Sequence, residues 1–140
     1  MTFLVDANVL SEPTKLRFEQ RVIDWLAEND TEIVVDPVVM GEIWEGIVAL
    51  EAGKKQRDLM QWFTELRASV LCLDWTLDTA IAWAELRDDV RRRCFTVPVK
   101  DTLIAATAKQ HGLTVATRNV DDFTRCGVPV LNPFADVQRS

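Results

Sequence analysis

In residues 3–12, FLVDANVLSE, a short apolar run stops at a carboxylate. Residues 2–5 (TFLV) are typical of a short buried strand, and Asp6 follows them directly. Asn8 comes two residues later, before apolar residues resume. A carboxylate that borders a hydrophobic core needs a compensating partner, proton or cation. The stretch therefore predicts a polar site at the end of the first strand.

Further apolar segments along the chain predict four more short strands. They are expected at 32–35 (EIVV), 70–73 (VLCL), 113–117 (LTVAT) and 128–131 (VPVL). Strands that are apolar throughout and alternate with helices are typical of an α/β fold with a mostly parallel sheet covered on both faces. In such sheets, sites form beyond the carboxyl ends of the strands, which is the position of Asp6.

The expected helices are recognised by their apolar faces and by their ends. An apolar stripe predicts a first helix that ends near residues 28–30, and it comprises Phe18, Val22, Trp25 and Leu26. Asp36 and Pro37 are an N-cap and a first-turn proline, and the helix they start is expected to run to about Gly53. Later helices are expected at 55–67, from Leu77 to the arginines at 91–93, and from Pro98 to His111–Gly112.

Length and composition favour one domain spanning residues 1–140. The chain is 48% apolar, which suffices for one core, and it has no run of about 20 apolar residues that would span a membrane. Its net charge of −6 argues against coating of nucleic acid by the whole surface. The three cysteines show no C-x-x-C pair and are expected to be buried free thiols. We expect a soluble, cytoplasmic protein.

Three acids lie where packing alone does not explain them. Asp6 ends a strand, Glu42 lies too deep in its helix for a capping box, and Asp101 heads a stripe of core-facing residues. Glu42 shares its expected helical face with Gly46 and Gly53, and this smooth face suggests close approach of another group. Each acid has another explanation when taken alone: an Asx-turn at Asp6, a solvated surface for Glu42, and a first-turn dipole contact for Asp101.

The three acids together favour a metal site. Two carboxylates about 4 Å apart repel by roughly 4 kcal/mol at an effective dielectric constant of 20, so a proton or a cation must accompany them. Hard oxygen ligands without a His or Cys cluster favour Mg²⁺, with Mn²⁺ as a substitute. A water bound to such an ion beside a phosphodiester offers a route to hydrolysis.

Four motifs, in order and spacing, resemble the PIN-domain ribonucleases of VapC-type (type II) toxin-antitoxin systems, including the FitB-like branch. The motifs are FLVDANVLSE, VMGEIWEGI, KDTLIAATAKQHGLTVATRNVDDF and LNPF. The resemblance covers essentially the whole chain. It implies a three-layer α/β/α PIN-like domain with a central parallel sheet, which acts as a Mg²⁺-dependent endoribonuclease toxin. Asp6, Glu42 and Asp101 match the acidic metal-binding and catalytic positions of that family.

The resemblance also implies secondary site residues. Asn119 stands at the family's fourth site position, where aspartate is common, and its neutral side chain removes one negative charge. Asp122 is a candidate replacement ligand, with a turn or helix-start aspartate as the alternative. Thr117 matches a hydroxyl position near the metals, and Asn8 matches a polar residue that steadies the Asp6 loop.

Partners follow from the same resemblance, which implies a homodimer and a cognate antitoxin. Apolar helical residues suited to those contacts are Trp44, Ile47, Trp62 and Phe63. Lys100 and Arg118 are candidate contacts to RNA phosphates, together with basic clusters at 54–57 and 91–93. The sole histidine, His111, precedes a helix-ending glycine and is interpreted as a partner of the helix dipole, which argues against a histidine-dependent ribonuclease.

Other classes of protein fit less well. A haloacid-dehalogenase-like phosphatase needs a second aspartate where this chain has Asn8, and a receiver domain needs an accepting aspartate after its middle strand, where only Asp74 beside Trp75 is available. The remaining alternative is a non-catalytic PIN-like module that binds RNA or protein through an incomplete acidic site.

Overall fold

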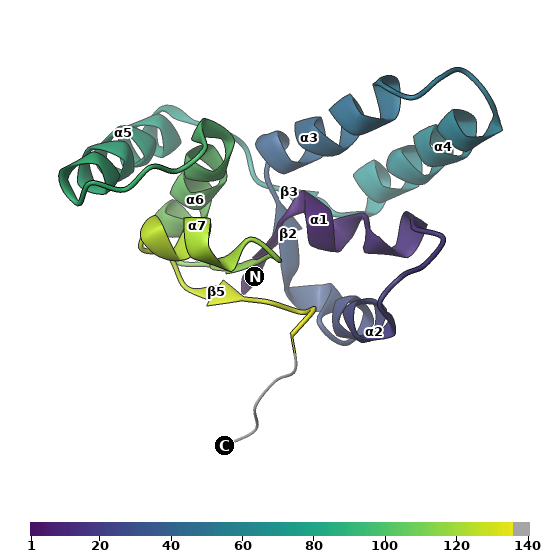
Figure 1. The fold of residues 1–140 in the computed structure, drawn as a ribbon, viewed down its shortest axis with the longest axis horizontal. Helices are drawn as coiled ribbons and strands as arrows, with labels where there is room; N and C mark the ends of the chain where they lie inside the picture. Colours follow the sequence, from purple (N-terminus) through teal and green to yellow (C-terminus); the bar gives the residue numbers. More distant parts are fainter. Residues whose placement is uncertain (136–140) are drawn as a thin grey trace.

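Five short strands form one all-parallel sheet in the computed structural model, which describes residues 1–135 (Figure 1). The strands are β1 (Phe3–Val5), β2 (Ile33–Val35), β3 (Leu71–Cys72), β4 (Thr114–Ala116) and β5 (Val130–Leu131). Their order in the sheet is β3-β2-β1-β4-β5, so β1 is central and pairs with both β2 and β4. The α/β class and the parallel sheet expected from the sequence are confirmed.

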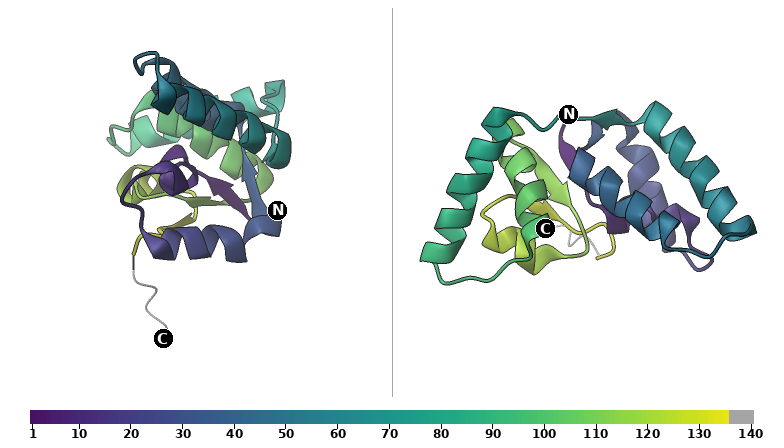
Figure 2. Two further views of the ribbon diagram at one scale, coloured as in Figure 1. Left: turned by 90° about the vertical axis from the view of Figure 1, so that its right-hand side faces the viewer. Right: turned by 90° about the horizontal axis from the view of Figure 1, so that it is seen from above.

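Helices cover both sides of this sheet. Within residues 1–135 the α-helices are α1 (Ala7–Leu10), α2 (Gln20–Glu28), α3 (Pro37–Val48), α4 (Lys54–Ser69), α5 (Leu77–Arg92), α6 (Val99–His111) and α7 (Val120–Arg125). Figure 2 shows α2 on one side of the strands and the helices from α3 to α6 on the other. The α3–α4 pair and the α5–α6 pair diverge as two arms from the strands. None of the helices in the described part of the chain is both long and apolar enough to cross a bilayer.

The strands are buried because they are apolar on both faces. Leu4, Val5 and Val115 are fully buried, and Val34 is only 1% exposed. The edge strand β3 differs, because Leu71 is 56% exposed and only two residues of the expected 70–73 strand pair with β2. The expectation of buried thiols holds for Cys126 alone, since Cys72 in this edge strand and Cys94 before α6 are exposed.

The first expected helix begins later than its apolar stripe predicts. Phe18 lies outside α2 and is 49% exposed, so its inclusion in that helix was wrong. The cause is the buried carboxylate of Glu12, whose Oε1 accepts the backbone N–H of Glu19 at 3.1 Å. Lys15 pairs with the other oxygen of Glu12 at 2.9 Å. These contacts anchor the chain just before α2 and delay its first turn.

The helix after Asp36 ends at Val48, five residues before the expected end at Gly53. Gln56 of α4 explains the difference, because its Nε2 donates to the carbonyl oxygens of Ile47 at 3.1 Å and Leu50 at 3.0 Å. These carbonyls would otherwise lack partners at a helix end. Gly53 therefore precedes α4, and the continuous small-residue face predicted beside Glu42 does not exist. Within residues 1–135, a Cβ built on Gly46 meets nothing within 4 Å, so no other described part of this chain approaches closely there.

Two predicted helix ends are confirmed. Asp36 is the N-cap of α3, and its Oδ1 accepts the backbone N–H of Val39 at 2.9 Å. The other oxygen of Asp36 accepts the hydroxyl of Thr107 in α6 at 2.8 Å. Gly112 ends α6 in the left-handed region, with φ of 66°. Asp36 therefore joins α3 to α6, the two helices that carry Glu42 and Asp101.

Candidate functional site

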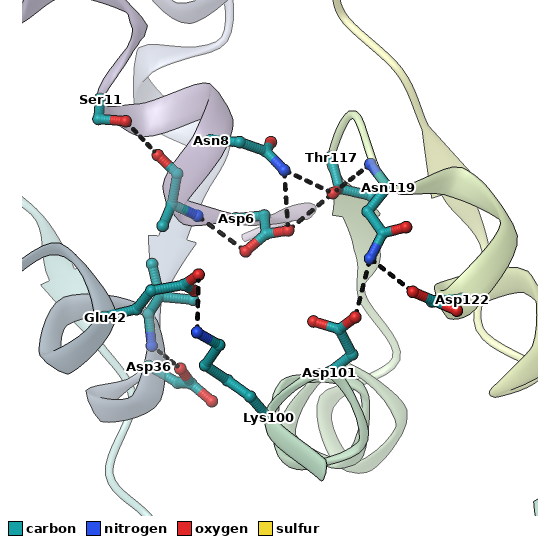
Figure 3. A network of polar contacts seen from close by, with 12 residues as sticks. Asp6, Asn8, Ser11, Asp36, Glu42, Lys100, Asp101, Thr117, Asn119 and Asp122 are labelled. Carbon is teal, nitrogen blue, oxygen red and sulfur yellow. Dashed lines mark hydrogen bonds and ion pairs between the residues drawn. The ribbon is translucent and has the colours of Figure 1, made fainter. Parts of the chain in front are cut away.

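Asp6 lies at the carboxyl end of the central strand and is the N-cap of α1. Its side chain is 4% exposed, and its Oδ1 accepts the backbone N–H of Ala7 at 2.8 Å. Its Oδ2 accepts the hydroxyl of Thr117 at 2.7 Å and the amide of Asn8 at 3.3 Å (Figure 3). Two local contacts and one from Thr117, which follows β4, therefore hold the Asp6 carboxylate in one orientation.

Asp101 reaches the same region from the first turn of α6. It is 9% exposed, and its Oδ2 accepts a hydrogen bond from the Asn119 side-chain amide at 2.8 Å. The same amide nitrogen donates to Asp122 Oδ2 at 2.9 Å, so Asn119 links two carboxylates. The second oxygen of Asp101 faces the region between Asp6 and Lys100 in Figure 3.

Glu42 points to this region from α3 and is half-buried. Its Oε1 pairs with the ammonium group of Lys100 at 3.1 Å, and Lys100 directly precedes Asp101 in α6. The sequence indicated neither partner for the other, because the two residues lie on different helices and share no local spacing. The contact between them follows only from the packing of α3 against α6.

The electrostatics indicate that the acids interact. Burial raises the pKa of Asp101 to about 6, and the charges of Asp6, Asp122 and Glu42 add to the rise while Lys100 opposes it. Burial also raises the pKa of Asp6, against hydrogen bonds from Thr117 and Ala7 that lower it. Acids with raised pKa values at the end of a parallel sheet are candidates for a functional site.

The donor set fits a hard divalent cation, although the side chains do not yet surround one. Within residues 1–135, no three His, Cys, Asp or Glu side chains stand in an arrangement that could hold a metal ion. Asp6 and Asp101 present buried carboxylates, Glu42 a half-exposed one, and the like charges among them raise the pKa of Asp101. Oxygen ligands of this kind suit Mg²⁺ or Mn²⁺.

The secondary residues predicted from the sequence also lie in this network. The buried hydroxyl of Thr117 accepts the backbone N–H of Asn119 at 2.9 Å in addition to its bond to Asp6. Asn8 accepts the backbone N–H of Arg118 at 3.1 Å, which connects α1 to the loop after β4. Asp122 lies in the first turn of α7, and Arg125 lies 3.4 Å from its other oxygen. Hydrogen bonds thus link six of the predicted site residues, Asp6, Asn8, Asp101, Thr117, Asn119 and Asp122. Glu42 contacts Lys100 instead.

Several of the other basic groups have acidic or aromatic partners. Lys54 pairs with Asp58, and the three arginines at 91–93 pair with the aspartates at 88 and 89. The guanidinium of Arg118 lies 3.8 Å from the ring centroid of Phe134, beside the site loop. Lys100 and Arg125 thus pair with acids of the site, and Arg118 lies beside the site loop.

The geometry agrees with a comparison to protein families, in which the PIN domain model matches residues 3–128. The chain belongs to the PIN-domain family. As a PIN domain it is similar along most of its length to Toxin FitB from Neisseria gonorrhoeae, at 34% identity over 95% of this chain and 99% of that protein. It is also similar to VapC ribonuclease Y4jK from Sinorhizobium fredii, at 30% identity over 94% of this chain and 96% of that protein.

Solved structures show the same PIN fold. The crystal structure of FitAcB from Neisseria gonorrhoeae superimposes with a TM-score of 0.86 and 31% identity, covering 95% of this chain and 99% of that one. The structure of FitAB bound to an IR36 DNA fragment gives a TM-score of 0.87 at 29% identity, with 96% of both chains covered. The likeness confirms the PIN-like fold expected from the sequence motifs.

Proposed function

We propose that this PIN domain is a metal-dependent endoribonuclease and the toxin of a toxin-antitoxin pair. The observation that carries the proposal is the convergence of Asp6, Glu42 and Asp101 at the carboxyl ends of the parallel strands, where neighbouring acids raise the pKa of Asp101. Relatives that bear the names VapC ribonuclease and Toxin FitB support the same activity.

Asp6, Glu42 and Asp101 would hold Mg²⁺, with Mn²⁺ as a substitute. When bound, such a cation lowers the pKa of water and stabilises the charge that develops on a phosphate under attack. Thr117 and Asn8 fix the Asp6 carboxylate, and the Asn119 amide fixes Asp101. These fixed orientations reduce the reorganisation that the reaction requires.

The chain's own residues can then direct hydrolysis of a phosphodiester. A site carboxylate, Glu42 or Asp101, accepts a hydrogen bond from the attacking water and orients it in line with the leaving 3′ oxygen. Arg118 lies beside the site loop and supplies a contact for the RNA backbone. No side-chain nucleophile is needed.

A histidine-based reaction is not supported by the placement of His111. His111 is the last residue of α6, whereas Asp101 lies in the first turn of the same helix. Ten residues of α-helix separate them by about 15 Å along the axis. His111 therefore lies too far from the acids to act on the same phosphate, and its place at the helix end agrees with a dipole contact.

Cleavage of folded RNAs by the purified chain tests the proposal. Wild-type protein should cleave RNA with Mg²⁺ or Mn²⁺ and should stop cleaving when EDTA is added. The cleavage rates of D101N and D6N should be at least about a hundredfold lower if each carboxylate serves the reacting centre. His111→Ala is the matched control and should retain the wild-type rate. Cleavage by D101N at that rate would contradict the assignment.

Asn119 motivates the second candidate function, a non-catalytic module that binds RNA or protein. Its amide replaces an acid and already bridges Asp101 and Asp122. Binding of Mn²⁺ and of RNA without cleavage in any substrate set would support this candidate over the nuclease.

We also propose a homodimer and a protein antitoxin as partners. Exposed apolar side chains support such contacts, because Trp44 of α3 is 38% exposed and Ile81 of α5 is 48% exposed. Ile47, which was expected to serve the same contacts, is 4% exposed and belongs to the core instead. Sedimentation of the purified chain tests the dimer, and growth arrest on expression of the wild-type chain but not of D101N tests the toxin.

A further inference from the structure

Lys100 occupies a position that helix stability does not explain. It is the second residue of α6, at the end of the helix where the macrodipole disfavours a cation. Its ammonium group lies 3.1 Å from Glu42 Oε1 on another helix, with 47% of the lysine side chain and 31% of the glutamate side chain exposed. Lys100 is therefore held by the acids of the site rather than by its own helix.

The positive charge of Lys100 interacts with every acid of the proposed metal site. Glu42 is its direct partner, and the ammonium opposes the rise that burial causes in the pKa values of Asp6 and Asp101. In Figure 3 the lysine side chain extends from α6 toward Glu42, between that residue and Asp101. The ammonium group of Lys100 thus supplies one positive charge among the three acids.

We propose that Lys100 is a resident counter-ion of Glu42, and that a divalent ion must displace its ammonium group to recruit this carboxylate. The inference rests on the proposed metal-dependent function. It is argued from the ion pair between Lys100 and Glu42 and from the position of the ammonium group among the acids. It makes Lys100 a residue that sets metal affinity, which is distinct from a contact to the RNA backbone.

Calorimetric titration of the full, EDTA-treated chain with MnCl₂ tests this proposal. Lys100→Met should lower the Kd for Mn²⁺ about three- to tenfold, since both the competing ion pair and a like charge disappear. Lys100→Arg should stay near the wild-type value. Lys109→Met is the matched control, because it removes the same charge from an exposed position in the last turn of α6 and should leave the Kd unchanged.

Two further measurements separate the contact with Glu42 from a general charge effect. In a Glu42→Gln background, Lys100→Met should raise the Mn²⁺ affinity by a smaller factor than in the wild type, because the ion pair is already absent and only the like charge is removed. In the wild-type chain, Mn²⁺ should speed acetylation of Lys100 severalfold, measured by mass spectrometry, without affecting Lys109. An equal gain in both backgrounds would overturn the displacement.

The outcomes distinguish this inference from the function on which it rests. Equal Mn²⁺ affinities for the wild type and Lys100→Met would overturn the role of Lys100 and leave the metal site intact. Failure of both proteins to bind Mn²⁺ at millimolar concentrations would overturn the metal site as well. Weaker RNA binding by Lys100→Met with an unchanged Mn²⁺ Kd would make Lys100 a phosphate contact and contradict its role toward the metal.

Discussion

At the scale of single residues, burial makes the charge of Asp101 unfavourable in the folded chain. Its pKa rises from 3.8 to about 6 on folding, chiefly through burial and then through Asp6, Asp122 and Glu42. A carboxyl whose pKa is raised stabilises the fold at low pH, and that contribution is lost as pH rises through the folded-state value. The metal-free protein therefore loses stability between about pH 4 and pH 6 because of this group.

D101N should remove this loss of stability with rising pH. Residue 101 cannot ionise in D101N. Without metal, the free energy of unfolding of D101N should therefore equal that of the wild type near pH 4 and exceed it by about 1–3 kcal/mol near pH 7. Urea denaturation in EDTA at both pH values measures the difference. If D101N exceeded the wild type in free energy of unfolding by the same amount at pH 4 and pH 7, the raised pKa of Asp101 would be contradicted.

Asn119 gives a second prediction at this scale. Its amide donates to Asp101 and Asp122, at 2.8 and 2.9 Å. N119D replaces these donors with a further negative charge. The free energy of unfolding of the metal-free protein should therefore fall by about 2–3 kcal/mol. Mn²⁺ should then stabilise N119D more than it stabilises the wild type. N119A removes the donors without adding charge and should lose less, and thermal unfolding with and without Mn²⁺ measures all three proteins.

The sequence identified the site acids because each interrupts an apolar pattern. Asp6 ends a strand and Asp101 heads a buried stripe, which packing alone does not require. The partner of each acid was harder to predict. Lys100 meets Glu42, and Asn119 meets Asp101, through contacts between elements far apart in the chain.

At the scale of elements, Asp36 determines how α3 is placed relative to α6. One of its oxygens caps α3 at Val39, and the other accepts the hydroxyl of Thr107 in α6. D36A should therefore cost about 2 kcal/mol of unfolding free energy through the lost cap and the unpaired hydroxyl. D36N retains an acceptor for the cap and should cost less. Urea denaturation compares them, and equal stabilities of D36A and the wild type would refute the role of Asp36.

Helix boundaries were predictable where a local signal exists. Asp36–Pro37 and Gly112 marked their helix ends correctly, because caps and left-handed glycines act on their own backbone. The end of α3 at Val48 depends on Gln56, a side chain from the next helix, so no local signal for it was present. The delayed start of α2 depends in the same way on Glu12.

At the scale of the whole molecule, the parallel sheet explains why the acids meet. Asp6 follows the central strand, and Thr117 follows β4 beside it, so their side chains meet at 2.7 Å. α3 follows β2 and brings Glu42, whereas α6 precedes β4 and brings Asp101. The alternation of apolar strands with helices predicted this arrangement, but the order of the strands required the structure.

We infer that Asp6, Glu42 and Asp101 together hold one divalent ion. The most direct test is anomalous diffraction from crystals of the chain soaked in MnCl₂, with D101N crystals treated in the same way. The predicted result is a peak within about 2–2.5 Å of oxygens from all three carboxylates, with Lys100 turned away from Glu42, and no such peak in D101N. Well-diffracting wild-type crystals without a peak between these acids would contradict the account.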